Sequence, residues 1–448
     1  MRNRIILLTL VLAAWMGLKA IDEWVTGPEV LWLLSVACVF LVMHSIWLLI
    51  AQGRWQRRSR RQLMTVQADQ TVSDESQWKP AVDIFIAAKN EARVIEKTVR
   101  NFFKIDYDDF SVWVIDDNST DATAEILARL QLEYPRLQIV RRTPGSCPGK
   151  SAALNAALPL SKGEVIAVFD ADAYVAPNFF ALMLPVLAAD GIGAVQAQKK
   201  IYEHQSGFLV DCQDSEYALD TYFQKGRDLI GGAVELRGNG QIIKRAALVD
   251  VGGWNNKAIT DDLDLSMRLL VSNWDIRFCP DAFVWEEGVT TVKALLRQRR
   301  RWAEGSIRRY LDYIFPLNSP TRLSLVERID TLVFTIYFVV PALVLCETAS
   351  ECGHLVMGVP TYGKFFGLVS MAVMLITQLN MLVAIKMYRP AMNIWRALLH
   401  SCEVTIYIYA HWVPVIIVSF CQIMFGKKTS TWHPTEHGAE SESDLLSA

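Results

Sequence analysis

Residues 163–174 read GEVIAVFDADAY, and this stretch decides the fold that we expect for the chain. Val165 to Phe169 is a short, wholly apolar run rich in β-branched residues, which is typical of a strand buried on both faces of a parallel sheet. It delivers Asp170 and Asp172 at its carboxyl end, where open α/β sheets bind ligands. Two carboxylates one residue apart can hold a divalent cation that also binds phosphate oxygens, although a surface loop can carry the same pair.

The 448-residue chain is too apolar for an ordinary soluble enzyme, since 52% of its residues are hydrophobic. The apolar residues concentrate at both ends and leave a middle of globular composition from about Lys79 to Glu287. A net charge of −2 gives no reason to expect a nucleic-acid partner. The eight cysteines include no C-x-x-C pair, so they do not indicate a zinc site.

Two apolar runs near the N-terminus predict a transmembrane hairpin over residues 1–52. Ile5–Ala20 is short, whereas Leu31–Ala51 has the roughly 20 apolar residues that span a bilayer. The run GRWQRRSRR at 53–61 then opens a basic flank and linker, 53–78. Because basic flanks stay in the cytoplasm, we expect an integral membrane protein with a cytoplasmic middle domain.

Strands and helices alternate through that middle, residues 79–290, which predicts an α/β domain with a mostly parallel sheet. The strands expected first along the chain are Val82–Ala87, Val112–Ile115, Ile139–Val140 and Val165–Phe169. Four acidic groups follow strands or open helices: Asp83 with Glu91, Asp116–Asp117, Asp170 with Asp172, and Asp261–Asp262. Helix N-termini favour acids anyway, so each group alone fits a structural role. Several acids near one edge of one sheet indicate a binding site.

Residues 291–315, TVKALLRQRRRWAEGSIRRYLDYIF, mix arginines with apolar residues. This pattern predicts a basic amphipathic helix, or two helices broken at Gly305, within an interface region at 291–328. Such a helix suits the inner face of an anionic membrane, and a solvated helix face is the alternative.

Further apolar runs predict a C-terminal transmembrane region at 329–426, followed by a polar tail at 427–448. The runs are Thr331–Cys346, Phe365–Ile385 and Val404–Phe425. Two spans before the domain and three after it would place the tail outside, whereas Lys427 and Lys428 favour the inside. The sequence leaves the number of C-terminal spans open.

The chain resembles the membrane-integrated, inverting family 2 glycosyltransferases of GT-A fold, which include cellulose, chitin and hyaluronan synthases. The resemblance covers roughly residues 79–302 and lies in the motifs VDIFIAAKNE, VIDDNSTD, GKSAALNAAL, FDAD, TDDLDLSMRL and QRRRW. The family usually has TED where this chain has TDD, an exchange that leaves the last aspartate, Asp262, in place.

The resemblance implies a role for each matching residue. Asp117 would bind the uracil or ribose of a UDP-sugar, with Lys150 nearby, and Asp170 would contact the nucleotide. Asp172 would ligate Mg²⁺ or Mn²⁺ on the diphosphate, and Asp262 would be the general base. The motif residues Gln298, Arg301 and Trp302 would close over the diphosphate and the acceptor.

The stretches RQRRRWAEGSIRRYLDY, LSLVERIDTLVF and WHPTEHG are similar to those of cyanobacterial β-monoglucosyldiacylglycerol synthases. That similarity implies a UDP-glucose donor, a 1,2-diacylglycerol acceptor and a place in a bacterial inner or thylakoid membrane. A processive polysaccharide synthase carries the same QRRRW element and is the alternative enzyme. An inactive membrane scaffold that binds a nucleotide or lipid is the alternative outside the enzymes.

Overall fold

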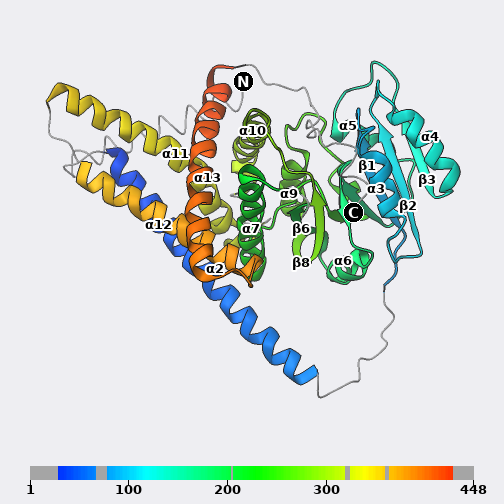
Figure 1. Ribbon diagram of the computed structural model, residues 1–448, viewed down its shortest axis with the longest axis horizontal. Helices are drawn as coiled ribbons and strands as arrows, with labels where there is room; N and C mark the ends of the chain where they lie inside the picture. The colour runs from blue at the N-terminus through cyan, green and yellow to red at the C-terminus, as the bar shows by residue number, and fades with distance from the viewer. Residues whose placement is uncertain (1–28, 67–77, 203–204, 318–322, 359–362, 427–448) are drawn as a thin grey trace.

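The computed structural model describes residues 29–66, 78–202, 205–317, 323–358 and 363–426, which form an α/β part and a set of long helices (Figure 1). The α/β part lies at one end and three of the long helices lie at the other, with three more between them. The outer helices are α2 (Glu29–Val66), α11 (Leu325–Met357) and α12 (Gly363–Tyr388). Those between are α7 (Phe208–Leu229), α10 (Val292–Leu317) and α13 (Ile394–Phe425).

The described strands form one sheet of eight in the order β3-β2-β1-β4-β7-β6-β8-β5. Their bounds are β1 (Val82–Ala88), β2 (Phe110–Asp116), β3 (Leu137–Arg141), β4 (Val165–Phe169), β5 (Tyr174–Val175), β6 (Ile192–Ile201), β7 (Gln241–Lys244) and β8 (Asp275–Glu286). Strand β1 pairs in parallel with β2 and with β4, and β2 pairs in parallel with β3. Strand β6 is parallel to β8. Strand β7 runs antiparallel between β4 and β6, and β5 is antiparallel to β8. The predicted mostly parallel α/β sheet is confirmed.

Strand β4 is buried on both faces, as its composition predicts. Val165, Ala167 and Phe169 belong to the core on one face of the sheet. Ile166 and Val168 belong to the core on the other face. Alternate side chains of a strand point to opposite faces, so only an all-apolar run satisfies two cores at once.

Short helices supply the other walls of these two cores. One core is covered by α3 (Ile95–Phe102), α4 (Thr123–Glu133) and α6 (Phe179–Ala188). The other is covered by α5 (Lys150–Ala157), α8 (Arg245–Asp250) and α9 (Asp261–Val271). Because α5 and α9 both begin at the carboxyl edge of the sheet, their first residues lie close to the end of β4.

Helix α10 is one continuous helix and does not break at Gly305. A Cβ atom at Gly305 would lie 2.5 Å from the side chain of Thr260, so this glycine allows α10 to approach the start of α9. The expectation that the arginines of this helix face a membrane or solvent is wrong for Arg299 and Arg309. Both are buried, and they form ion pairs with Glu216 and Glu235 inside the protein.

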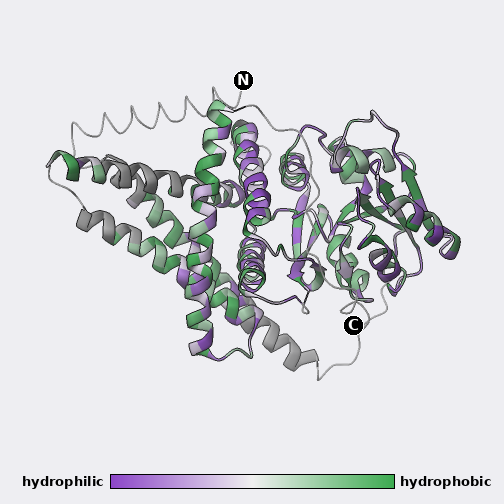
Figure 2. Ribbon diagram, turned by 45° about the horizontal axis from the view of Figure 1, so that its top comes forward, coloured by the Kyte–Doolittle hydropathy of each residue, from purple (hydrophilic) through white to green (hydrophobic). Residues whose placement is uncertain are grey.

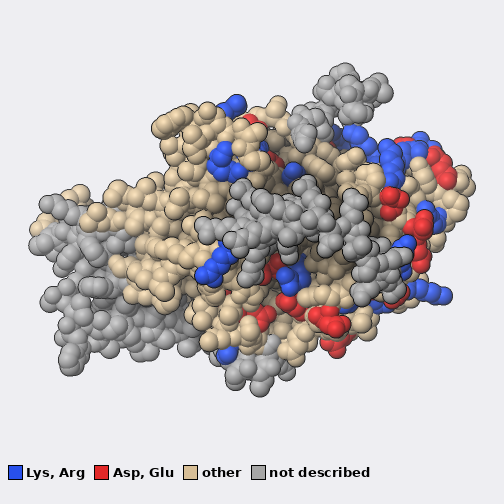
Figure 3. Space-filling model, turned by 90° about the horizontal axis from the view of Figure 1, so that it is seen from below, with Lys and Arg blue, Asp and Glu red and all other residues tan. Residues whose placement is uncertain are grey.

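Three described helices are long and apolar enough to cross a membrane: α2 over Ser35–Arg54, α12 over Met371–Tyr388, and α13. Their ribbons are largely apolar where Figure 2 colours them, and charged side chains lie mostly on the α/β side in Figure 3. Helix α2 continues to Val66, so the predicted linker at 53–78 begins as helix. The predicted first span, Ile5–Ala20, and the tail at 427–448 lie outside the described residues.

Candidate active site

A cavity of about 310 Å³ lies between the carboxyl edge of the sheet and the helices α7, α10, α11 and α13. Of the site residues that the sequence predicts, seven line this cavity: Lys150, Asp170, Asp172, Asp262, Gln298, Arg301 and Trp302. They come from the end of β4, from the starts of α5 and α9, and from α10, and they lie up to 152 positions apart in the sequence. The fold therefore assembles these motifs in one place.

Asp170 is held by the first residue of α5. Its Oδ1 atom accepts a hydrogen bond from Lys150 Nζ at 2.5 Å, and Lys150 also donates to the carbonyl oxygen of Gly238 at 2.9 Å. Burial raises the pKa of Asp170, but the Lys150 charge outweighs this effect and the pKa lies below its ordinary value. Asp170 is therefore ionised and directed by a fixed cation.

Asp172 is fixed through its backbone and one carboxylate oxygen. The Glu287 backbone N–H donates to Asp172 Oδ2 at 3.0 Å, and the Tyr202 hydroxyl donates to the Asp172 carbonyl oxygen at 2.8 Å. Both partners come from the ends of β6 and β8, so the neighbouring strands orient the second acid of the D-x-D pair.

Asp262 lies in the first turn of α9, facing the cavity. Its Oδ1 atom accepts from the Leu263 backbone N–H at 2.8 Å, and a Cβ atom at Gly238 would lie 3.1 Å from its Oδ2. Gly238 also has a φ of +77°, which other residues adopt only with strain. Burial and the neighbouring Asp261 carboxylate raise the pKa of Asp262 to about 6. A carboxyl group with that pKa can accept a proton near neutral pH.

Asp117 does not line this cavity. It is buried at the end of β2, where its carboxylate pairs with Arg142 and accepts from the Gly149 backbone N–H at 3.2 Å. Gly149 directly precedes Lys150, so Asp117 supports the loop that opens α5.

The two acids of the first predicted group separate. Glu91 lines the cavity. Asp83 lies at the other end of β1, where it accepts from the backbone N–H groups of Lys162 and Gly163 and pairs with Arg245 at 3.2 Å. Asp83 is therefore a structural residue. The expectation that groups it with the site acids is wrong, because Asp83 lies at the start of β1 and Glu91 lies beyond its carboxyl end.

The QRRRW element lines the cavity from α10. The Trp302 ring stacks under the guanidinium of Arg299, whose Cζ lies 4.1 Å from the ring centroid. Arg299 in turn donates to Glu216 of α7 at 2.7 Å. The middle of the motif thus orients Trp302, while Gln298 and Arg301 face the cavity.

Several charged residues line the cavity although no sequence motif indicated them. They are Lys199, Glu216, Asp220, Glu235, Arg237, Glu286, Glu287 and Arg309. They lie on β6, β8, α7 and α10 or in the loops that follow α7 and β8, where the local patterns look like ordinary solvated faces. Only the tertiary fold turns these faces inward.

The charges that line the cavity are unequal, with ten carboxylate side chains and five lysine or arginine side chains. An anionic ligand would meet net repulsion there, and a bound divalent cation would reduce it. Within the described part of the chain, no group of three His, Cys, Asp or Glu side chains could enclose a metal ion. Magnesium fits such a site, because it is usually held by one or two carboxylates together with substrate phosphates.

The family model described as glycosyltransferase like family 2 matches residues 80–305, which include the sheet, the D-x-D pair and Asp262. The chain belongs to glycosyltransferase family 2. This glycosyltransferase is 40% identical to the β-monoglucosyldiacylglycerol synthase of Nostoc sp. strain PCC 7120, over 81% of this chain and 78% of that protein. It is 35% identical to the synthase of the same name from Synechocystis sp. strain PCC 6803, over 97% of this chain and 88% of that protein.

More distant matches include the poly-β-1,6-N-acetyl-D-glucosamine synthase of Staphylococcus epidermidis, with 26% identity over 82% of this chain and 90% of that protein. Among solved structures, a mannosyltransferase of Pyrobaculum calidifontis in complex with GDP-Man and Mn²⁺ superposes with a TM-score of 0.60 and 19% identity. The match covers 88% of this chain and all of that chain. The GT-A fold expected for this glycosyltransferase is confirmed.

The cavity of this glycosyltransferase also reaches the long apolar helices. Phe334 of α11 and Trp412 of α13 line it, and Trp412 lies within a helix apolar enough to cross a membrane. Trp412 Nε1 donates to Glu216 at 2.7 Å, which fixes the indole ring at the cavity wall. One wall is therefore polar and acidic, and another is built by aromatic side chains of the long helices α11 and α13.

Proposed function

We propose that this enzyme transfers glucose from UDP-glucose to the hydroxyl of 1,2-diacylglycerol with inversion, which gives β-monoglucosyldiacylglycerol. The observation that carries the proposal is the shared cavity, in which Asp262 and the D-x-D acids meet Phe334 and Trp412. A water-soluble acceptor needs no contact with a helix that can cross a membrane, such as α13, whereas a lipid alcohol with two acyl chains does. The cyanobacterial relatives are named after this activity, and their similarity covers most of the chain, which supports the same acceptor.

The donor would bind at the carboxyl edge of the sheet. Asp117, which lies outside the cavity lining, would bind the uracil or ribose of UDP-glucose, with Lys150 nearby, and Asp170 would contact the nucleotide. Asp172 would ligate Mg²⁺ or Mn²⁺, in keeping with the excess of acids around it. When bound, the cation lowers the charge repulsion of the diphosphate and makes it a better leaving group.

Asp262 would take the proton of the acceptor hydroxyl. An alcohol is a poor nucleophile at neutral pH, so a positioned carboxylate is needed as the base. Asp262 is half-buried at the cavity wall, and its pKa of about 6 leaves it ionised at neutral pH and basic enough to accept a proton. A single in-line displacement at the anomeric carbon converts an α-linked donor into a β-glycoside without a covalent intermediate.

Gln298, Arg301 and Trp302 would close over the diphosphate and the acceptor. Arg301 adds a permanent positive charge to the cavity, and the Trp302 ring offers a flat surface for a sugar. The basic residues at 53–61 support a cytoplasmic position of the catalytic domain, beside a bacterial inner or thylakoid membrane.

The test is to incubate membranes that contain the protein with labelled UDP-glucose, Mg²⁺ and diacylglycerol, followed by extraction into chloroform and methanol. We expect the label in the organic phase as a monoglucosyl lipid with a β linkage. Label in a high-mass polymer would instead identify a polysaccharide synthase. The matched control is the Asp262→Asn protein in the same membranes, which should give neither product.

A further inference from the structure

Lys199 of β6 is a nearly buried lysine in the cavity wall. Its side chain is 11% exposed, and it lines the cavity together with Asp170 and Asp172. Removing an ammonium group from water is costly, and an uncharged residue would complete the strand without this cost. The position of Lys199 beside the D-x-D acids therefore requires an explanation beyond packing.

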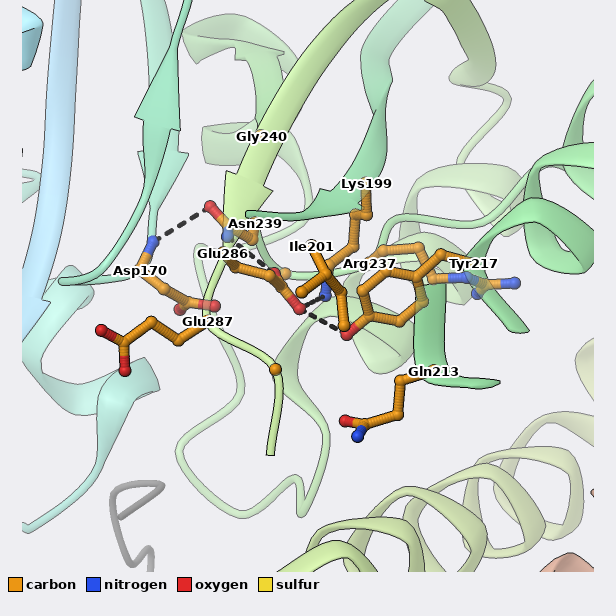
Figure 4. A network of polar contacts seen from close by, with 12 residues as sticks. Asp170, Lys199, Ile201, Gln213, Tyr217, Arg237, Asn239, Gly240, Glu286 and Glu287 are labelled. Atoms are coloured by element: carbon orange, nitrogen blue, oxygen red, sulfur yellow. Dashed lines mark hydrogen bonds and ion pairs between the residues drawn. The ribbon is translucent and has the colours of Figure 1, made fainter. Parts of the chain in front are cut away.

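Glu286, the last residue of β8, fixes the Lys199 ammonium (Figure 4). Lys199 Nζ lies 2.8 Å from Glu286 Oε1, which also accepts from the Tyr217 hydroxyl at 2.5 Å. Glu286 Oε2 accepts from Asn239 Nδ2 at 2.8 Å. Both oxygens of Glu286 are thus engaged with protein groups, so this carboxylate orients Lys199 and is not itself directed at a ligand.

The same network is tied to the D-x-D pair. Asn239 Oδ1 accepts from the Asp170 backbone N–H at 3.2 Å (Figure 4). The Glu287 backbone N–H donates to Asp172 at 3.0 Å. Glu286 and Glu287 are adjacent in sequence, so the end of β8 positions both acids and Lys199 together. The end of β8 and Asn239 therefore link Lys199 to both acids.

The Lys199 ammonium also shares its surroundings with Trp302. Its Nζ lies 5.0 Å from the ring centroid of Tyr217 and 5.8 Å from that of Trp302. Burial raises the pKa of Asp170, while the charges of Lys150, Lys199 and Arg301 lower it. Three cations on different elements therefore surround the first acid of the D-x-D pair.

We propose that Lys199 is a further donor-binding residue, whose ammonium contacts the diphosphate of the sugar nucleotide, with Glu286 and Tyr217 as positioning residues. This inference rests on the proposed function. In the displacement, the bond from the anomeric carbon to the diphosphate oxygen breaks as the bond to the acceptor oxygen forms. The bonding electrons leave with the diphosphate and the acceptor proton passes to Asp262. Lys199 keeps its proton and stabilises the charge of the leaving group.

The experiment compares the binding of UDP, UMP and uridine to the full-length protein in detergent with Mg²⁺, by titration calorimetry. Lys199→Met should weaken UDP binding by about tenfold or more, since a hydrogen bond between charged groups is lost, and leave uridine binding nearly unchanged. Lys200→Met is the matched control on the same strand. Lys200 Nζ lies over the rings of Phe283 and Tyr388 and does not line the cavity, so this variant should bind all three ligands normally.

The positioning role has its own readout. Glu286→Gln keeps an oxygen for Asn239 but removes the charge opposite Lys199, so the preference for UDP over uridine should fall. Combined with Lys199→Met, it should add little further loss, because Glu286 acts through Lys199. Strictly additive losses in the double variant would contradict this part of the proposal.

Each result decides something. Equal weakening of UDP, UMP and uridine by Lys199→Met would show a structural effect and overturn the inference, as would unchanged UDP binding. If the wild-type protein binds UDP no better than uridine, the proposed donor fails and the inference fails with it. If the wild-type protein prefers UDP and Lys199→Met keeps that preference, only the inference fails.

Discussion

Asp330 of α11 lies 2.7 Å from Arg227 of α7, and neither side chain is exposed. The same carboxylate accepts from the Ala233 backbone N–H at 3.0 Å and contacts His44 of α2 at 2.9 Å. One buried aspartate therefore joins two of the long outer helices to the catalytic domain. Ala233 lies in the loop that leads from α7 to Gly238, so the junction also supports the wall beside Asp262.

Asp330→Ala should destabilise the protein strongly. Removing one partner of a buried ion pair leaves Arg227 without its main counter-charge, which costs about 3–5 kcal/mol. We expect a clear fall in the melting temperature of the detergent-solubilised protein. The control is Glu133→Gln, which breaks an exposed pair with Arg100 and should change melting far less. Equal melting of both variants would refute a special role for Asp330.

Asp262→Asn should abolish glucosyl transfer while UDP-glucose still binds. Asparagine keeps the shape of the side chain but cannot accept the proton, and loss of a general base lowers the rate by about 10²- to 10⁴-fold. The measurement is turnover alongside donor binding by calorimetry. Turnover equal to that of the wild type would exclude Asp262 as the base.

The activity should depend on pH through the same residue. Because the pKa of Asp262 in the free enzyme is raised to about 6, the base is protonated below that pH, and kcat/KM should rise as the pH increases through about 6. Asp261→Asn removes the adjacent negative charge that helps to raise the pKa of Asp262, so the acid limb of the pH profile should move to lower pH. A limb that stays in place would show that Asp261 does not set the pKa.

Asp172→Ala should remove activity together with the requirement for a divalent metal. We expect the wild-type enzyme to lose activity in a chelator and to recover it with Mg²⁺ or Mn²⁺. The variant should stay inactive with either ion, because the carboxylate that would hold the ion is gone. A variant that remains active in chelator would argue against a metal at this position.

Trp302→Ala should damage transfer more than folding. The ring lines the cavity and stacks on Arg299, whose ion pair with Glu216 remains after the substitution. Turnover should fall steeply while the melting temperature changes little. Trp395→Ala, on the exposed start of α13, is the control of equal size and should leave turnover intact. Parallel losses of turnover and melting temperature for Trp302→Ala would return it to a structural role.

The sequence alone determined the fold class, because hydrophobic periodicity is local. The all-apolar run Val165–Phe169 can satisfy two cores only at the centre of a sheet, and the structure places it there. Short motifs with fixed spacing also identified the family, since each combines a strand end with the polar residue that follows it. Predictions from the local pattern were wrong for Gly305, expected as a possible helix break, and for Arg299, expected on an exposed face. Both residues contact neighbours that are distant in sequence.

The tertiary structure alone decided which charged residues face the cavity and which do not. Asp83 and Glu91 are eight positions apart and lie at opposite ends of β1, so only Glu91 reaches the cavity. Lys199 and Glu286 are brought together by the parallel pairing of β6 with β8, a contact that no local pattern encodes. The physical reason is that burial and electrostatic pairing depend on distance in space, whereas propensity and periodicity depend on distance along the chain.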